Sequence, residues 1–497
     1  MLTLLHTSDW HLGRRLYGKP RYEEFARFLA WQVEMIDRHQ VDVLLIAGDI
    51  FDTTSPSNQA QSLYYDFLYK VNQTDCRHVV IVGGNHDSPS FLDAPKALLK
   101  GFNIHVIGSI SDQLDDEILI LTDAQGTPEM IIIAVPYLRD RDVRTVASGE
   151  RLDDKENKLI QGIRSHYQAV TELAIVRQRA LEQQTGKKIP LIGTGHLFAA
   201  GGKTIEDDGV RELYVGSLAH VSADIFDRHL DYVALGHLHV PQNVGGQAHI
   251  RYSGSPIAMG FGEASQQKQV HLVRFAVEQK LAEQPVFPLI SKLSSSLVAV
   301  HSSSHRHPLL DKVKKANPTR HQDTCDFTLL LDDELGKTAT TTPRSTALDS
   351  IDLTEPYNLV LLSDTILLQS LAVPTFQPLL SVKGDWQTIQ ATLEPLKKSN
   401  QSFWLEVIYD SDTVMGDLRE RLDALIKDSQ LEVIRLKNLQ IKNHTLQAQS
   451  SNETLEELDE QQVFERCLMA HNVSDAQKPV MWARYYDVLE SLRENNS

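Results

Sequence analysis

The sequence predicts an α/β protein in which sheets and helices form layers, followed by smaller parts. Three observations lead to this class. Short apolar runs ending in polar turns recur through the first 280 or so residues, amphipathic helical patterns lie between them, and acidic or imidazole side chains follow several runs. Runs of this length suit strands buried on both faces, and open α/β sheets place their binding residues just after such strands.

The expected elements alternate along the first part of the chain. Residues 22–39 and 57–71 carry apolar side chains at helical spacing and predict two amphipathic helices. Strands are expected where short apolar runs stand before turns rich in glycine and polar residues. These runs are residues 2–6, 41–47, 79–82, 131–135, 191–194 and 232–235.

Composition narrows the class of protein. The 497 residues allow two to four domains, and 41% hydrophobic with 23% charged residues is typical of a globular chain. The three cysteines, Cys76, Cys325 and Cys467, are far apart, which excludes a disulfide framework or a cysteine zinc site and favours a reducing compartment. No apolar run approaches the roughly 18 residues of a membrane span, and no secretory signal is visible.

Changes in residue composition and hydrophobic patterning divide the chain into four predicted parts. Serine and threonine clusters predict a low-complexity, partly disordered insertion, with candidate strands at 327–331 and 359–362. A regular pattern then resumes and predicts a small α+β domain, followed by two tail helices, the second starting near Ser474. The parts are residues 1–286, 287–373, 374–445 and 446–497.

Within the small α+β domain, four elements are expected. A helix is predicted over residues 385–398, and a second helix is predicted from a cap at Asp412 or Thr413 to Lys427. Strands are predicted at residues 403–409 and 431–436.

Five motifs carry the candidate chemistry, and each follows a predicted strand. Asp and His one residue apart project to the same side of an extended turn and can share one ion. Carboxylate, amide oxygen and imidazole suit Mn²⁺, Fe²⁺ or Zn²⁺, and the preceding glycines allow a tight turn. The motifs are Asp9-Trp10-His11, Gly48-Asp49 with Asp52, Gly84-Asn85-His86-Asp87, Gly195-His196 and Gly236-His237-Leu238-His239.

The number of possible ligands predicts two metal ions. Six groups accompany one shared carboxylate, Asp49, which is too many for a single ion, so Asp49 is expected to bridge two. His86 stands beside a ligand and is free to contact a substrate oxygen. Each motif alone is weak, but all five in order indicate a metal site. The six groups are Asp9, His11, Asn85, His196, His237 and His239.

The order of these motifs resembles the calcineurin-like metallophosphoesterase superfamily and, more closely, its bacterial SbcD family. The resemblance covers residues 1 to about 286 and resumes from about 374 into the tail. It implies a four-layer sandwich of two mixed β-sheets flanked by helices, a small α+β cap and a C-terminal helix pair. The matching stretches are residues 6–13, 47–53, 84–88, 194–197, 234–239 and 252–257.

The resemblance also assigns roles to individual residues. It puts Asp9, His11, Asp49 and His239 on one ion, and Asp49, Asn85, His196 and His237 on the other. His86 corresponds to the family's catalytic histidine. Archaeal and eukaryotic relatives tend to have histidine where this chain has Asp52, so the role of that histidine is not transferred.

The activity that the resemblance implies is DNA processing. The family implies a Mn²⁺-dependent 3′→5′ exonuclease on duplex ends and an endonuclease that opens hairpins, acting in replication, recombination and repair. Its partner is the SbcC ATPase, in a heterotetramer with two copies of each subunit and a homodimer of the nuclease chain, in the cytoplasm at the nucleoid. Residues 201–204 do not form a P-loop, because Leu197 stands where a glycine is needed, so the ATPase belongs to the partner.

The tail offers an apolar face for that partner, although folding back onto this chain's own core is the alternative. The family's C-terminal helix pair grips the coiled-coil base of SbcC. Residues 401–497 hold 18 acidic and 10 basic groups, so the last fifth of the chain carries nearly half of the net charge of −17. The apolar residues concerned are Leu455, Leu458, Val463, Phe464, Leu468, Trp482, Tyr485, Tyr486, Val488 and Leu489.

Two rival functions use the same residues. One is a metallophosphoesterase for small phosphodiesters or phosphoproteins, against which Trp10, the cap and the helical tail argue. The other is a non-catalytic scaffold, against which the complete ligand set with His86 argues. Basic residues of the cap either hold DNA or form a solvated surface, and His301, His305 and His307 are expected to be solvated.

Overall fold

The computed structural model describes residues 1–143, 152–199, 221–276, 359–411 and 415–439, together with Phe464, Leu468, Lys478, Met481, Trp482 and Tyr485. The chain divides into two compact units, Met1–Pro378 and Leu379–Ser497. Within the described residues, no helix has the combination of length and apolar character that crossing a membrane demands.

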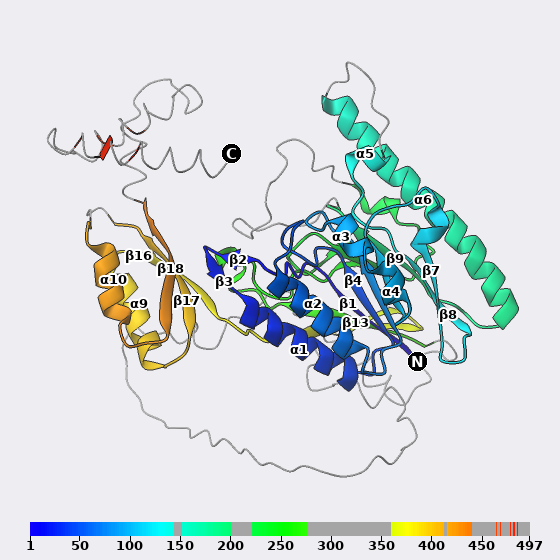
Figure 1. Ribbon diagram of the computed structural model, residues 1–497, viewed down its shortest axis with the longest axis horizontal. Helices are drawn as coiled ribbons and strands as arrows, with labels where there is room; N and C mark the ends of the chain where they lie inside the picture. The colour runs from blue at the N-terminus through cyan, green and yellow to red at the C-terminus, as the bar shows by residue number, and fades with distance from the viewer. Residues whose placement is uncertain are drawn as a thin grey trace, which may run out of the picture. The chain divides into compact units, whose positions relative to one another are not determined.

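A seven-stranded mixed sheet runs through the first unit (Figure 1). In spatial order its strands are β14 (Leu359–Ser363), β15 (Ile366–Ala372), β13 (Gln269–Phe275), β1 (Leu2–Thr7), β4 (Val43–Ala47), β5 (His78–Val82) and β6 (Ile104–Ile107). The strands β1, β4, β5 and β6 pair in parallel, whereas β13, β14 and β15 pair antiparallel. The turns after the parallel strands therefore gather at one edge of the sheet.

A six-stranded sheet faces the first one. Its order is β11 (Gln242–Val244), β12 (Gln247–Tyr252), β10 (Tyr232–Gly236), β9 (Leu191–His196), β8 (Pro128–Ile133) and β7 (Ile118–Thr122). The central strands β12, β10, β9 and β8 are parallel, so β9 and β10 also end at a common edge. A short separate ladder pairs β2 (Arg15–Leu16) with β3 (Lys19–Pro20).

Three apolar clusters hold four layers together. One packs Phe28 of α1 (Tyr22–Arg38) and Phe67 of α2 (Asn58–Val71) against the first sheet. The second joins Leu4 of β1 to Ile132 of β8 and fills the space between the sheets. The third packs Tyr167 of α6 (Leu152–Thr185) on the second sheet, and Figure 1 shows α6 on that outer side. The predicted sandwich of two mixed sheets flanked by helices is confirmed.

Short helices connect these layers. They are α3 (Pro89–Asp93), α4 (Lys96–Lys100), α5 (Asp140–Val143) and the 3₁₀ turns η1 (Leu114–Glu117), η2 (Ala223–Ile225) and η3 (Phe261–Glu263). The helix α2 begins as its sequence predicts, because the Ser57 side chain accepts a hydrogen bond from the Ala60 backbone N–H at 3.2 Å.

The end of the predicted insertion belongs to the first sheet. The predicted strand at 359–362 is confirmed as β14, and β15 continues the sheet by pairing with β13. Leu367 and Leu368 of β15 are fully buried, so residues 359–372 are part of the folded core rather than a disordered insertion. The candidate strand at 327–331 lies outside the described residues, as do residues 201–204, His301, His305 and His307.

The second unit alternates strands and helices. Its elements are β16 (Leu379–Gly384), α9 (Trp386–Lys398), β17 (Phe403–Tyr409), α10 (Leu418–Ile426) and β18 (Leu431–Asn438). The predicted helix over 385–398 and both predicted strands are confirmed. Because β16, β17 and β18 are all parallel, the described part of this unit is α/β rather than the expected α+β.

The second unit also shows where its second helix begins and how part of the tail packs. The helix α10 begins after Asp417, with Gly416 just before its start, and the expected caps Asp412 and Thr413 lie outside the described residues. In the tail, the ring of Phe464 stacks on that of Tyr485 at a centroid distance of 4.3 Å and meets Trp482 edge-on at 5.0 Å. Parts of the two predicted tail helices therefore contact each other, and Leu468 is buried.

Candidate metal centre

Turns at the carboxyl ends of five strands bring the predicted ligands together. Strands of the first sheet supply five of the eight residues and strands of the second sheet supply three. Asp9 and His11 follow β1, Asp49 follows β4, Asn85 and His86 follow β5, His196 ends β9, and His237 and His239 follow β10. The site therefore lies where the edges of the two facing sheets meet.

The backbone of these turns is strained at three of the predicted ligands. Asp9, His11 and Asp49 have φ values of 54°, 50° and 51°, in the left-handed region that costs energy for residues with a Cβ. Two hydrogen bonds tie the first two turns together, from the Asp9 N–H to the Gly48 carbonyl and from the His11 N–H to the Asp49 carbonyl, each 3.0 Å long. Such strain persists only where the surroundings enforce it, which is typical of functional turns.

Two glycines allow the turns to approach closely. Gly48 has a φ of +91°, and a Cβ there would overlap the Nδ1 atom of His196. A Cβ on Gly84 would overlap the Oδ1 atom of Asp49. The glycines that precede the ligands in the sequence are therefore required for contact between neighbouring turns as well as for their curvature.

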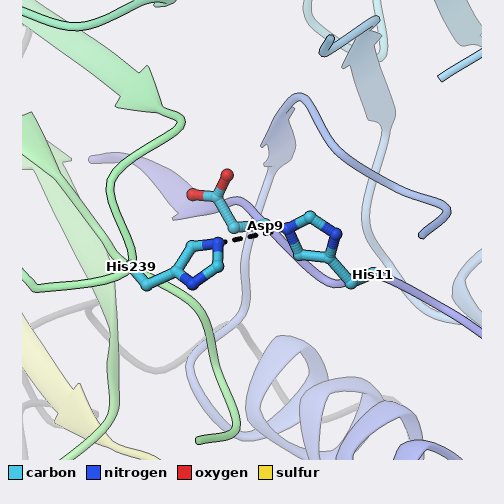
Figure 2. Close-up of side chains that lie close together, drawn as sticks. All are labelled: Asp9, His11 and His239. Atoms are coloured by element: carbon cyan, nitrogen blue, oxygen red, sulfur yellow. Dashed lines mark hydrogen bonds between the residues drawn. The ribbon is translucent and has the colours of Figure 1, made fainter. Parts of the chain in front are cut away.

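Asp9, His11 and His239 form the first cluster (Figure 2). Their ligand atoms lie within 4.8 Å of one another, and the Nε2 atoms of His11 and His239 are 3.2 Å apart. All three side chains are buried. The Asp9 carboxylate accepts hydrogen bonds from the His237 N–H at 2.8 Å and from the Ser8 hydroxyl at 2.6 Å, which fixes its direction.

Asp49, His196 and His237 form the second cluster, with Asn85 beside it. The Asn85 Oδ1 atom lies 3.0 Å from both His196 Nε2 and His237 Nδ1. Asp49 Oδ2 lies 3.2 Å from His196 Nε2 and 3.7 Å from His11 Nε2. One carboxylate oxygen therefore stands between the two clusters.

Burial and charge act in opposite directions on the titration of these groups. Burial lowers the pKa of His237 to about 3 and that of His11 to about 4, so both imidazoles are neutral at pH 7. Burial would also lower the pKa of His196, but the Asp49 carboxylate raises it to about 9. Burial alone would raise the pKa of Asp49, yet His196 and the other imidazoles hold it well below its usual range.

The donor set fits divalent cations. Ligand atoms about 2.1 Å from a shared ion lie roughly 3 to 4 Å apart, which matches the separations within each cluster. The neutral imidazoles of His11 and His237 are ready to donate a lone pair, His196 would release its proton to bind a cation, and buried carboxylates supply the negative charge that two cations need. The described residues therefore offer a pair of adjacent metal positions.

His86 lies at the edge of both clusters. Its backbone N–H donates to Asp49 Oδ1 at 2.9 Å, and its ring Nδ1 donates to the Asp52 carbonyl at 2.9 Å. Its ring meets that of His11 edge-on at 4.8 Å. Asp52, His11 and His86 form a third group of possible ligands, but Arg14 Nη1 already lies 3.1 Å from the Asp52 carboxylate.

Two buried acids near the ligands were not predicted to take part. The Asp87 carboxylate accepts backbone hydrogen bonds from Gly84 at 2.9 Å, Ile50 at 3.1 Å and Phe51 at 2.9 Å, which joins the second and third turns. Glu263 Oε1 lies 3.2 Å from His239 Nδ1. Asp87 stands inside a recognised motif, whereas nothing in the sequence around Glu263 distinguishes it.

Comparisons with known proteins agree with the geometry. A family model described as calcineurin-like phosphoesterase matches residues 2–241, and the SbcD_C model, described as type 5 capsule protein repressor C-terminal domain, matches residues 375–472. A chain that carries this match, the four-layer sandwich and the paired clusters is a calcineurin-like phosphoesterase.

Curated relatives narrow the family. The SbcD subunit of nuclease SbcCD from Escherichia coli K12 is 29% identical over 493 residues, spanning 99% of this chain and 98% of that protein. The corresponding subunit of Rhodobacter capsulatus is 35% identical over 55% of this chain and 67% of its own length, and that of Bacillus subtilis is 30% identical over 64% and 77%. The chain belongs to the SbcD family.

Proposed function

We propose that this chain is the nuclease subunit of an SbcCD-type complex and hydrolyses phosphodiester bonds of DNA with two divalent metal ions. We propose Mn²⁺ as the identity of both ions. The observation that carries the proposal is the position of Asp49 Oδ2, 3.2 Å from His196 of one cluster and 3.7 Å from His11 of the other. The proposed ligands are Asp9, His11, Asp49 and His239 for one ion, and Asp49, Asn85, His196 and His237 for the second.

The bound ions and His86 have separate proposed roles in the reaction. When bound, two divalent ions would supply Lewis-acid stabilisation of a phosphate and lower the pKa of a water molecule. Because the Nδ1 atom of His86 donates to the Asp52 carbonyl, its Nε2 atom is the one that can reach a phosphate or leaving oxygen. We assign to His86 the stabilisation or protonation of that oxygen.

The relatives, which are subunits of nuclease SbcCD, support the proposed partner and substrate. We propose SbcC as the ATPase partner, two copies of each subunit, a homodimer of this chain, and a location at the nucleoid in the cytoplasm. The proposed DNA reactions are 3′→5′ exonuclease action on duplex ends and endonuclease cleavage of hairpins, in replication, recombination and repair. The proposed contact with SbcC is made by the tail after residue 445. This tail includes Phe464 and Leu468, which are among its described residues.

A nuclease assay tests this proposal. The substrate is a hairpin-ended duplex, and the chain is assayed with and without SbcC, Mn²⁺ and ATP. We expect hairpin opening and end degradation that require Mn²⁺, with ATP dependence only when SbcC is present. Turnover of bis-p-nitrophenyl phosphate without any metal-dependent DNA cleavage, in the presence of SbcC, would instead point to a small-phosphodiester enzyme.

Binding to the partner is tested separately. A chain that ends at about residue 452 should fail to co-purify with SbcC if the tail forms the contact. Retention of the complex by that truncated chain would contradict the assigned role of the tail. The DNA assay above does not depend on this result.

A further inference from the structure

A buried ion pair lies behind the first cluster. Glu263 is fully buried and Lys268 is 6% exposed, and the Lys268 ammonium donates a hydrogen bond to Glu263 Oε2. The other carboxylate oxygen of Glu263, Oε1, lies 3.2 Å from Nδ1 of His239. Neither residue of the pair belongs to the predicted ligands.

The pair joins three segments of chain. Lys268 Nζ also donates to the His239 carbonyl at 3.2 Å and to the Ser255 hydroxyl oxygen at 3.0 Å. Glu263 Oε2 accepts a further hydrogen bond from the Met259 N–H at 2.9 Å. His239 is therefore held at both its carbonyl and its ring by one pair of opposite charges.

Stability alone is a poor explanation for this arrangement. Removing two charges from water costs several kcal/mol per ion, and well-packed apolar side chains in their place are often as stable or more so. A buried pair aimed at one ring nitrogen of a histidine instead suggests a role at that histidine.

The hydrogen bond from His239 Nδ1 to Glu263 fixes the tautomer of the His239 imidazole. With Nδ1–H donating to Glu263, the lone pair of His239 is on Nε2, the atom 3.2 Å from His11 Nε2 in the first cluster. In the second cluster, Nδ1 of His196 donates to the neutral Ala47 carbonyl at 2.9 Å. A carboxylate makes the imidazole a stronger donor to a metal than a carbonyl does, so the two clusters are not equivalent.

We propose that Glu263, with Lys268 as its counter-charge, is a positioning residue that orients His239 and strengthens binding of the ion in the first cluster relative to the second. The inference rests on the proposed function, because it requires the two-ion site. Glu263 and Lys268 lie outside the motifs, and their effect would make the affinities of the two ions different.

Two double variants separate charge from geometry. Glu263→Leu with Lys268→Met removes both charges together, so neither is left buried and unpaired, and it removes the hydrogen-bond acceptor of His239. Glu263→Gln with Lys268→Met also removes both charges but keeps an acceptor oxygen. We expect the Leu/Met variant to bind one of two Mn²⁺ ions about 10- to 100-fold more weakly and the Gln/Met variant to recover part of that loss.

The measurement is Mn²⁺ titration of the metal-free full chain, with free Mn²⁺ followed by electron paramagnetic resonance. Repeating it in an Asn85→Ala background, which weakens the second cluster, identifies the ion affected: the remaining tight ion should be the one that the Leu/Met pair weakens. Glu117→Gln is the matched control, since Glu117 is buried and accepts from His166 Nε2 at 2.8 Å outside both clusters. It should leave both affinities unchanged, and circular dichroism checks that each variant is folded.

The outcomes are distinct. Unchanged Mn²⁺ affinities in the folded Leu/Met variant overturn the inference. Equal weakening of both ions also overturns it, because a general loosening of the fold would act on both. A wild-type chain that binds fewer than two ions refutes the proposed two-ion site first, and the inference fails with it.

Discussion

At the scale of single residues, the site depends on side chains that hold the turns as much as on those that face the clusters. Asp87 is 1% exposed and its carboxylate accepts three backbone hydrogen bonds from the turns that carry Asp49 and Asn85. Burial raises the pKa of Asp87 to about 6, so these three donors are what keep a charged form in place at neutral pH.

Asp87→Asn should therefore disturb both clusters. The amide leaves one acceptor oxygen and directs an N–H₂ group toward a backbone donor, which costs about 1–3 kcal/mol of unfolding free energy. Misplaced turns should lower DNA hydrolysis by about 100-fold. Asp123→Asn is the control, since Asp123 also accepts backbone bonds, from Gln125 and Thr127, in the turn between β7 and β8. Wild-type hydrolysis by Asp87→Asn would contradict its assigned role.

His86→Asn tests the other edge of the site. If His86 contacts the reacting phosphate, this variant should bind Mn²⁺ as wild type does and cleave DNA about 100-fold or more slowly. The exposed His229, 2.7 Å from Asp227 and outside both clusters, provides the control variant His229→Asn. Cleavage at the wild-type rate by a Mn²⁺-loaded His86→Asn chain would remove His86 from the reaction.

At the scale of elements, the turns after the strands set how closely the proposed ligands approach one another. Gly48 combines a φ of +91° with a position where any added Cβ would overlap His196 Nδ1. Gly126 has a similar φ of +82° but open space around it. The pair therefore separates backbone strain from steric contact.

Gly48→Ala should cost more than Gly126→Ala. Both substitutions incur about 1–2 kcal/mol of left-handed backbone strain, but only the first also displaces His196 from its place beside Asp49. Mn²⁺ titration should show loss of the second ion in Gly48→Ala and two ions in Gly126→Ala. Equal Mn²⁺ binding by the two variants would show that the close approach at Gly48 is not required.

The elements also show which parts of the fold and the site can be predicted from the sequence. Buried runs such as 41–47 and their glycine turns predict the strands and the candidate ligands that follow them, because both features are local in sequence. The sequence places the hairpin of β14 and β15 in the predicted insertion, because the pairing of β15 with β13 depends on contacts about 100 residues away. Glu263 could not be predicted from the sequence for the same reason, because its partner His239 is 24 residues distant and no motif joins them.

At the scale of the whole molecule, the two facing sheets enclose a few buried polar side chains within an otherwise apolar core. His6 of β1 lies between the sheets with its Nδ1 atom 2.9 Å from the Tyr232 hydroxyl of β10, and its ring is 5.8 Å from that of His271. Burial lowers the pKa of His6 to about 3 and that of His271 well below its usual range. Both rings are therefore neutral in the folded protein at every pH from 5 to 8.

Stability should consequently depend on pH through His6. In the unfolded chain His6 titrates near 6.5, so below that pH the unfolded state binds a proton that the folded state does not, and stability falls as the pH drops from 6.5 toward 3. Between pH 7.5 and 5.5 this one group should cost about 1.4 kcal/mol. In paired urea titrations of metal-free protein, wild type should lose that much more stability than His6→Gln over the same interval. Because the other histidines are common to both chains, equal losses would show that His6 is protonated inside the fold.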